Sequence, residues 1–168
     1  MHIPIIFRTF APENAATMKR ILAIILTFIS IATMAQTQIY RGKSSYSGDI
    51  LYSFDGKAVY KGRSNYSGDI LFSWDGKYVY KGRSSYSGDI LYTWDGKYLY
   101  SGKSTYSGDI NLRFDGTYIY KGKSTYSGDI LYTIKDGYVY RGKSTYSGDI
   151  LYTINGILPI PILVMMMQ

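Results

Sequence analysis

Hydrophobic and polar positions recur with a period of twenty residues from Lys43 onward. In the third copy, two apolar and aromatic runs of strand length, 90–94 and 98–100, flank an Asp-Gly pair. Asp-Gly between such runs is typical of a tight hairpin, since glycine accepts the positive φ that the turn requires. A second reversal, Tyr-Ser-Gly-Asp at 86–89, leads from one hairpin to the next. Each unit is therefore predicted to supply two antiparallel strands.

The period itself is evidence of a repeat architecture. No unit gains or loses a residue, and the six units begin at Lys43, Arg63, Arg83, Lys103, Lys123 and Lys143. A lone hairpin cannot bury its apolar surface, so the units must pack on one another. The predicted fold is all-β, an antiparallel meander of six 20-residue β-hairpin repeats. The pattern allows two arrangements, a stacked β-solenoid or a closed ring or barrel.

The turn chemistry also predicts a strand register. A two-residue Asp-Gly loop would pair Trp94 with Lys97 and Tyr92 with Leu99. Ile90 would then share a face with both aromatic residues, while the opposite face is also partly apolar. In the fifth unit the Asp-Gly pair moves one place later although the unit stays twenty residues long. We therefore expect the strand register outside the loop to be kept there.

The chain before the repeats has the pattern of an export signal. Residues 18–20 are a short basic start, 21–31 are apolar, and small residues precede Gln36. We expect a signal peptide at 18–35 and interpret 1–17 as a mis-called N-terminal extension; a long n-region and an uncleaved anchor are the alternatives. The repeat domain is assigned to 36–156, and we expect export to the periplasm, the outer surface or the extracellular space.

Residues 157–168 replace the tyrosine-rich strand of the last unit by an apolar tail with Pro159 and Pro161. Prolines remove hydrogen-bond donors from a strand ladder, so they suit an edge position. We expect an apolar C-terminal capping strand that seals the array, and a membrane anchor and a partner-docking tail are the alternatives. The segment is too short and too broken by proline to cross a bilayer as a helix, so no transmembrane segment is expected in the mature chain.

Charge and residue types limit the functions to consider. Removing Arg8, Lys19, Arg20 and Glu13 from the 19 basic and 12 acidic residues leaves 16 and 11 in the mature chain, a net charge of +5. These cations are spread over all the units, so we expect no nucleic-acid binding. The sequence from 36 onward also holds no His, Cys or Glu. Since catalysis usually needs such groups or a metal, we expect neither an enzyme nor a cofactor.

The aspartates recur at two turn positions. One row follows Ser-Gly: Asp49, Asp69, Asp89, Asp109, Asp129 and Asp149. The other precedes Gly: Asp55, Asp75, Asp95, Asp115 and Asp136. Aspartate at such positions accepts hydrogen bonds from nearby backbone amides, which is the structural interpretation. A calcium ladder along one row is the alternative, but a single carboxylate per turn is sparse for calcium, and we expect no metal site. Six equivalent sites would also be unusual for a glycosidase.

Aromatic residues offer the most prominent binding chemistry, because all 20 tyrosines follow residue 36. They can pack across strands, or they can line shallow clefts between repeats that take sugar rings or cationic head groups, with Lys and Arg on the rim. The candidate binding residues are Tyr52, Trp74, Tyr78, Tyr92, Trp94, Tyr98 and Tyr132.

These observations predict an exported, non-enzymatic structural or binding module of the bacterial envelope. Its expected partner is a cell-surface glycan or another envelope component. The alternative is a self-assembling matrix or fibre-forming surface protein, in which exposed strands of one molecule pair with those of another.

The segment 70–80, Ile-Leu-Phe-Ser-Trp-Asp-Gly-Lys-Tyr-Val-Tyr, resembles the hairpin unit of the 4-fold beta flower domains of Bacteroidota proteins. That resemblance implies an exported or surface protein without an established activity. Six units and the Tyr-Ser-Gly-Asp turn depart from the family pattern. The period is also similar to that of choline-binding and glucan-binding wall repeats, although their Gly-Trp and Trp-Tyr-Tyr signatures are absent. Neither resemblance supplies ligand residues.

Overall fold

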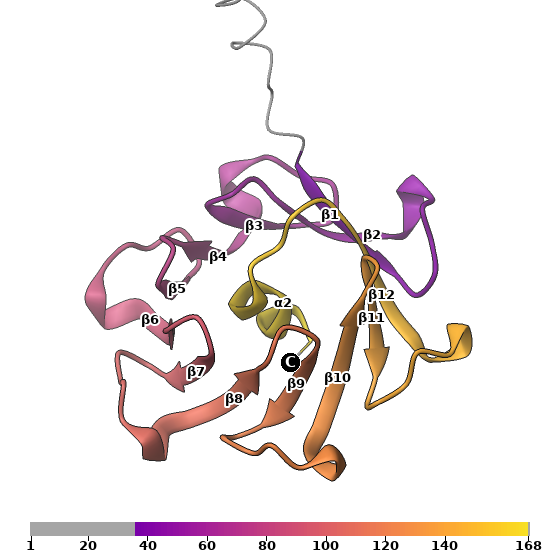
Figure 1. Ribbon diagram of the computed structural model, residues 1–168. Coiled ribbons are helices and arrows are strands. Elements are labelled where there is room, and N and C mark those ends of the chain that lie inside the picture. The colour runs from indigo at the N-terminus through magenta and orange to yellow at the C-terminus, as the bar shows by residue number, and fades with distance from the viewer. Residues whose placement is uncertain (1–35, 168) are drawn as a thin grey trace, which may run out of the picture. The chain divides into compact units, whose positions relative to one another are not determined.

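A computed structural model describes residues 36–167 of the chain (Figure 1). The expected extension at 1–17 and the signal peptide at 18–35 lie outside these residues. Within 36–167, twelve antiparallel strands follow one another in chain order around one closed barrel, and the first pairs with the last. The ring or barrel form of the predicted meander is therefore confirmed, and the open solenoid is wrong.

The elements repeat with the sequence. The strands are β1 Thr37–Arg41, β2 Ile50–Phe54, β3 Ala58–Lys61, β4 Ile70–Trp74, β5 Tyr78–Lys81, β6 Ile90–Trp94, β7 Tyr98–Ser101, β8 Ile110–Phe114, β9 Tyr118–Lys121, β10 Ile130–Lys135, β11 Tyr138–Arg141 and β12 Ile150–Asn155. The Ser-Gly-Asp segments form short 3-10 turns: η1 Ser47–Asp49, η2 Ser67–Asp69, η3 Ser87–Asp89, η4 Ser107–Asp109, η5 Ser127–Asp129 and η6 Ser147–Asp149. These turns lie farthest from the centre of the ring, like the tips of petals (Figure 1).

The hairpin loops are longer than the Asp-Gly pair alone. In the third unit Trp94 pairs with Leu99, so the expected pairing with Lys97 is wrong. The Asp95 carboxylate accepts hydrogen bonds from the amides of Lys97 and Tyr98 at 2.8 and 2.6 Å, which stabilises a loop of four residues. Because the register moves by two residues, Trp94 and Leu99 still share a face.

The fifth unit does form the two-residue loop. Asp136 and Gly137 have φ values of 53° and 78°, the positive values at both positions that a type I′ turn requires. Beyond the loop, Ile134 pairs with Val139, as the equivalent residues do in the third unit. The expected conservation of the outer register is confirmed.

One residue changes face between neighbouring hairpins. Val79 pairs with Tyr92, but the next pair is Tyr80 with Ile90, because Leu91 is the extra residue of a β-bulge. The bulge reverses the alternation and places Ile90 on the outer face. The expectation that Ile90 shares a face with Tyr92 is therefore wrong.

β1 supplies the second strand of the sixth hairpin. Its segment Ile-Tyr-Arg-Gly at 39–42 matches Val-Tyr-Lys-Gly at 79–82, and Ile39 pairs with Ile154 of β12. Units counted from Lys43 leave this strand out. Residues from the two ends of the described chain thus complete one hairpin and close the ring.

The C-terminal tail forms a helix, α2 Ile160–Met166, and not the expected capping strand. β12 already pairs with β11 and β1, so its edges offer no place for another strand. Pro159 precedes the helix and Pro161 lies in its first turn, where a missing amide leaves no hydrogen bond unmade. α2 lies at the centre of the ring of strands (Figure 1).

The hydrophobic core fills the barrel lumen around α2. Each hairpin contributes one buried aliphatic side chain from its second strand: Ile39, Val59, Val79, Leu99, Ile119 and Val139. Ile162 and Leu163 of α2 are 0% and 1% exposed within the same cluster. The tail therefore completes the core.

Across residues 36–167, none of the helices has the length and apolar character needed to span a lipid bilayer.

Candidate functional site

One rim of the barrel carries a ring of basic side chains. They occupy the last position of the second strand in each hairpin, and all are exposed. We call Arg41, Lys61, Lys81, Lys121 and Arg141 the rim cations; Ser101 holds the sixth position. Each lies two residues after a buried core aliphatic, so its side chain leaves the strand on the lumen side.

Large side chains from the first strands lie next to the rim cations on the lumen side. This lumen ring consists of Tyr52, Phe72, Tyr92, Leu112, Tyr132 and Tyr152. Lys61 is the cross-strand partner of Tyr52, and Arg141 is that of Tyr132, so each pair shares a face. The rim therefore combines cations with phenols.

The phenols of neighbouring hairpins interact with each other. Burial raises the pKa of Tyr152, and the phenols of Tyr52 and Tyr132 raise it further, while Arg41 opposes them. These side chains come from β2, β10, β12 and β1, which lie close together around the barrel. Phenols and a cation thus influence one another electrostatically at this part of the rim.

The rim cations have no carboxylate to neutralise them. Among residues 36–167 the one ion pair joins Arg113 to Asp115, at 4.0 Å. The aspartates instead accept hydrogen bonds inside their own units. Asp75 accepts the amides of Lys77 and Tyr78 at 2.9 and 2.7 Å, and Asp49 accepts the Ser44 hydroxyl at 2.6 Å.

A repeated contact joins the hairpin loop to the second strand. The Tyr80 hydroxyl donates to the Asp75 carboxylate at 2.7 Å, and this contact recurs from Tyr60, Tyr100 and Tyr120. It raises the pKa of Tyr80 to about 12, with burial as the second cause. Burial acts to raise the pKa of Asp75, but the amide and hydroxyl donors outweigh it and hold that pKa below its usual value.

Among residues 36–167, the His, Cys, Asp and Glu side chains form no group of three or more that could hold a metal ion.

The outer face of the barrel carries a second set of aromatic contacts. Tyr78 packs edge-on against Tyr80, with ring centres 6.2 Å apart, and the Lys77 ammonium lies 5.1 Å from the Tyr78 ring centre. The third unit repeats both contacts, at 6.3 Å between rings and 5.2 Å from Lys97 to Tyr98. Both contacts favour a fixed ring orientation.

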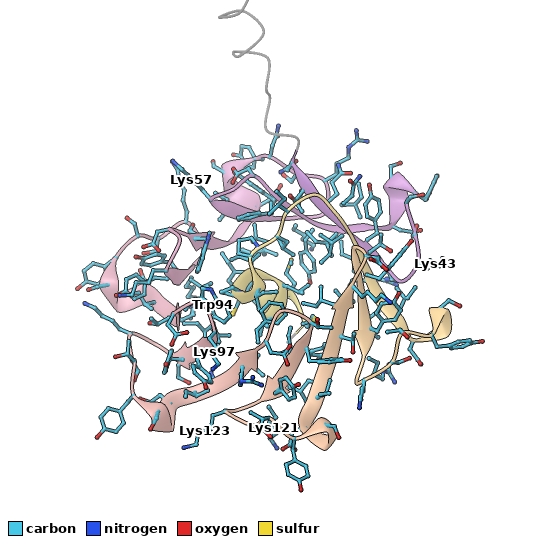
Figure 2. All side chains as sticks on the ribbon, in the orientation of Figure 1. Lys43, Lys57, Trp94, Lys97, Lys121 and Lys123 are labelled. Carbon is cyan, nitrogen blue, oxygen red and sulfur yellow. The ribbon has the colours of Figure 1, made fainter. Side chains whose placement is uncertain are left out.

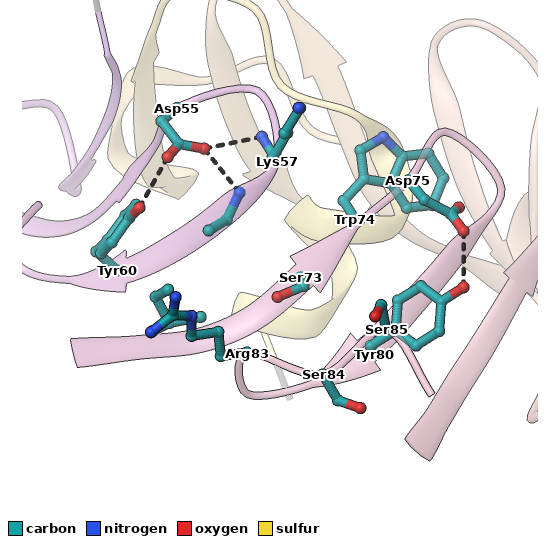
Figure 3. A pocket seen from close by; sticks show the side chains of 12 residues that line it. Asp55, Lys57, Tyr60, Ser73, Trp74, Asp75, Tyr80, Arg83, Ser84 and Ser85 are labelled. Carbon is teal, nitrogen blue, oxygen red and sulfur yellow. Dashed lines mark hydrogen bonds between the residues drawn. The ribbon is translucent and has the colours of Figure 1, made fainter. Parts of the chain in front are cut away.

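Two hollows open on this outer face at equivalent junctions between hairpins. One, of about 330 Å³, is lined by Ala58, Tyr60, Trp74 and Arg83 among others (Figure 3). The other, of about 220 Å³, lies between Tyr138, Thr153 and the loop 43–45. The larger hollow lies where the tyrosine of other units is replaced by alanine.

The structure separates the predicted binding residues into two sets. Tyr52, Trp74, Tyr92, Trp94 and Tyr132 pack against the core in the lumen, and Trp94 lies near α2 in Figure 2. Tyr78 and Tyr98 lie on the outer face. The predicted residues therefore do not form a single cleft.

The sequence predicted Lys and Arg at the edges of aromatic clefts between repeats, and the rim cations of the barrel were not identified from it. Their signal is a basic residue before glycine in five of the six matching positions, 41, 61, 81, 121 and 141. It also missed six tyrosines that begin the Ser-Gly-Asp turns and are 69–78% exposed: Tyr46, Tyr66, Tyr86, Tyr106, Tyr126 and Tyr146.

Comparison with known proteins agrees with this architecture. A family model described as a 6-fold beta flower protein matches residues 30–163. No curated protein and no solved structure matches the chain significantly. The expected beta flower resemblance is thus confirmed at the level of the repeat, with six units in place of four. With its matched region covering most of the sequence and six hairpins closing one ring, the chain belongs to the 6-fold beta flower protein family.

Proposed function

We propose that this protein is an exported, non-enzymatic binding module that holds an anionic glycan of the cell envelope across its rim. The observation that carries the proposal is the ring of five rim cations, all exposed and none paired with a carboxylate among residues 36–167. Clustered cations of one sign attract anionic polymers, and several weak contacts on one rigid ring add up to useful avidity.

The lumen ring supplies the second part of the proposal. Phenol hydroxyls beside the rim cations can exchange hydrogen bonds with sugar hydroxyls, and aromatic rings can contact sugar faces. Lys61 beside Tyr52 and Arg141 beside Tyr132 give this combination twice. A polysaccharide bearing carboxylate, sulfate or phosphate groups matches both chemistries.

The same arrangement argues against the two alternatives. Cationic head groups would meet like charges at the rim. Fibre formation through strand edges needs unpaired strands, whereas every strand described between 37 and 155 pairs on both sides. A soluble ring that presents a charged rim is the better account.

The test compares two variants that remove the same number of charges. In the rim variant the five rim cations become Gln. In the control variant five basic residues that begin the units, Lys43, Arg63, Arg83, Lys103 and Lys123, become Gln. Binding to polygalacturonate and to neutral dextran is measured by biolayer interferometry at fixed ionic strength, and circular dichroism checks the fold.

We expect the wild-type protein to bind polygalacturonate and to show no measurable binding to dextran. The rim variant should lose at least tenfold in affinity, while the control variant should stay within about threefold, because cations of its set, such as Lys43 and Arg83, line the outer hollows and do not lie beside the lumen ring. Equal losses of affinity in the two variants would mean that binding depends on net charge alone, and this would contradict the proposal.

A further inference from the structure

Position 58 departs from a row of tyrosines: of the six second strands in the ring, four carry a tyrosine there, β1 carries Gln38 and β3 carries Ala58. The equivalent residues of the next four units are Tyr78, Tyr98, Tyr118 and Tyr138. Ala58 is 7% exposed, and it lines the larger outer hollow. This junction therefore lacks the aromatic ring that four of the other five junctions contain.

The groups that hold the ring elsewhere are present at Ala58. Tyr78 is contacted by Lys77 and Tyr80, and Tyr98 by Lys97 and Tyr100. The counterparts Lys57 and Tyr60 both line the hollow. The Tyr60 hydroxyl donates to Asp55 at 2.8 Å, as its counterparts do to their aspartates, so the ring of Tyr60 is held in the same way (Figure 3).

The space also corresponds to a missing ring. The hollow beside Ala58 measures about 330 Å³, against about 220 Å³ at the junction where Tyr138 is present. Ile70 adds apolar surface to the hollow, and Trp74, which also packs against the core, borders the hollow at the end of β4. The aspartates that line the hollow already accept amide and hydroxyl donors. An apolar hollow with fixed polar neighbours suits a small planar ligand.

We propose that the hollow beside Ala58 is a binding site for the aromatic ring of a phenol-class small molecule. The bound ring takes the place of the absent tyrosine, with its edge or face against Tyr60 and with the Lys57 ammonium over its π system. The site lies on the outer face, so it is separate from the rim and does not rest on the glycan proposal.

The experiment uses 4-methylphenol, which is the tyrosine side chain itself, as the probe. The purified ¹⁵N-labelled protein is titrated with it, and the amide signals of Lys57 and Tyr60 are followed by NMR. A parallel titration with 4-methylcyclohexanol tests whether the π system matters, because this compound has a similar size and keeps the hydroxyl. A single ring of this size predicts a millimolar Kd.

Two variants test the place of binding. Ala58→Tyr fills the hollow with the protein's own ring and should weaken 4-methylphenol binding at least tenfold, with the fold unchanged. Tyr78→Ala opens the equivalent position of the next junction and should add a second set of shifting signals, at Lys77 and Tyr80. If Tyr78→Ala does not fold, the Ala58→Tyr result alone decides.

Three results would overturn the proposal. Ala58→Tyr could bind 4-methylphenol as the wild type does, or 4-methylcyclohexanol could bind equally well. Sedimentation could instead show that the wild type self-associates and that Ala58→Tyr does not, which would assign the hollow to an exposed tyrosine of a second copy. Loss of glycan binding in the rim variant would leave the result at Ala58 unaffected, so the two proposals fail separately.

Discussion

At the residue scale, the contact between a loop aspartate and a strand tyrosine stabilises each of four hairpins. Asp75 accepts two backbone amides and the Tyr80 hydroxyl, so one carboxylate fixes both the hairpin loop and the position of an aromatic ring. In the sixth hairpin Gln38 takes over part of this role, accepting the Tyr40 hydroxyl at 2.6 Å. Four aspartates of the row that precedes Gly, which the sequence presented as turn residues, thus also orient tyrosines.

Replacing Tyr80 with Phe removes that hydroxyl and keeps the ring. A hydrogen bond to a charged acceptor is lost, but Asp75 retains its two amide donors, so we expect the free energy of unfolding to fall by about 1–2 kcal/mol. Tyr66→Phe is the matched control, because that side chain is 69% exposed. Urea denaturation measures both, and an equal effect of the two substitutions would contradict the assigned role.

The same contact predicts a loss of stability in alkali. The carboxylates raise the pKa of Tyr80 and Tyr100 to about 12, above the ordinary 10.0. The folded state therefore holds these protons more tightly than the unfolded state. Their contribution is full below about pH 10 and falls as the pH rises from about 10 to 12.

In acid the dependence of stability on pH is the opposite for the partner carboxylate, because stability is lost as the pH falls. Burial acts to raise the Asp75 pKa, but its hydrogen bonds keep it below the ordinary 3.8, so its contribution is present above that pH and is lost as the pH falls further. Urea midpoints measured across both ranges test these statements. Substituting both Tyr80 and Tyr100 with Phe should make the alkaline decline shallower, and an unchanged slope would count against the contact.

At the scale of elements, the sequence predicts the features that depend on neighbouring residues but not those that depend on packing in the closed barrel. The strands and reversals follow from the twenty-residue period and from Asp-Gly and Ser-Gly-Asp turn chemistry, which act within a few residues. The four-residue loop and the bulge at Leu91 shift the register by small amounts that several turn types can satisfy. The loop length and the bulge therefore could not be predicted from the turn residues alone.

α2 shows the opposite case. Residues 160–166 form a helix whose apolar side chains pack in the barrel lumen, and they cannot extend the sheet because β12 has no free edge. The lumen and the paired edges of β12 exist only once the barrel has closed. The rim cations follow the same logic, since only the closed ring brings residues twenty apart into one circle. The predicted aromatic set is split between lumen and outer face by strand alternation instead, because Trp94 pairs with Leu99 and the neighbouring Tyr98 lies on the opposite face.

The core role of α2 predicts a marked effect of one truncation. Leu163 is 1% exposed among core side chains, so Leu163→Ala should lower the free energy of unfolding by about 2–5 kcal/mol. Ile157 precedes the helix and is 88% exposed, so Ile157→Ala should change it by less than about 0.5 kcal/mol. Thermal and urea denaturation compare the two, and similar small effects would mean that α2 does not complete the core.

At the scale of the molecule, closure converts a chain of similar hairpins into one ring. The seam is the hairpin made of β1 and β12, where Gln38 pairs with Asn155 and Ile39 with Ile154. Closure gives every strand two neighbours, encloses the core around α2, and arranges the rim cations in a circle. Both the circle of rim cations and the absence of a free edge between residues 37 and 155 depend on this seam.

The distance across the seam tests closure most directly. The chain has no cysteine, so Gln38→Cys and Asn155→Cys accept spin labels at these two sites alone. Double electron–electron resonance then measures the distance between the labels. A closed ring predicts a single short distance below about 20 Å, because the two residues are cross-strand partners. An open array of twelve strands would separate them by about 50 Å, at roughly 4.8 Å per strand, and that result would contradict the fold on which the binding proposals depend.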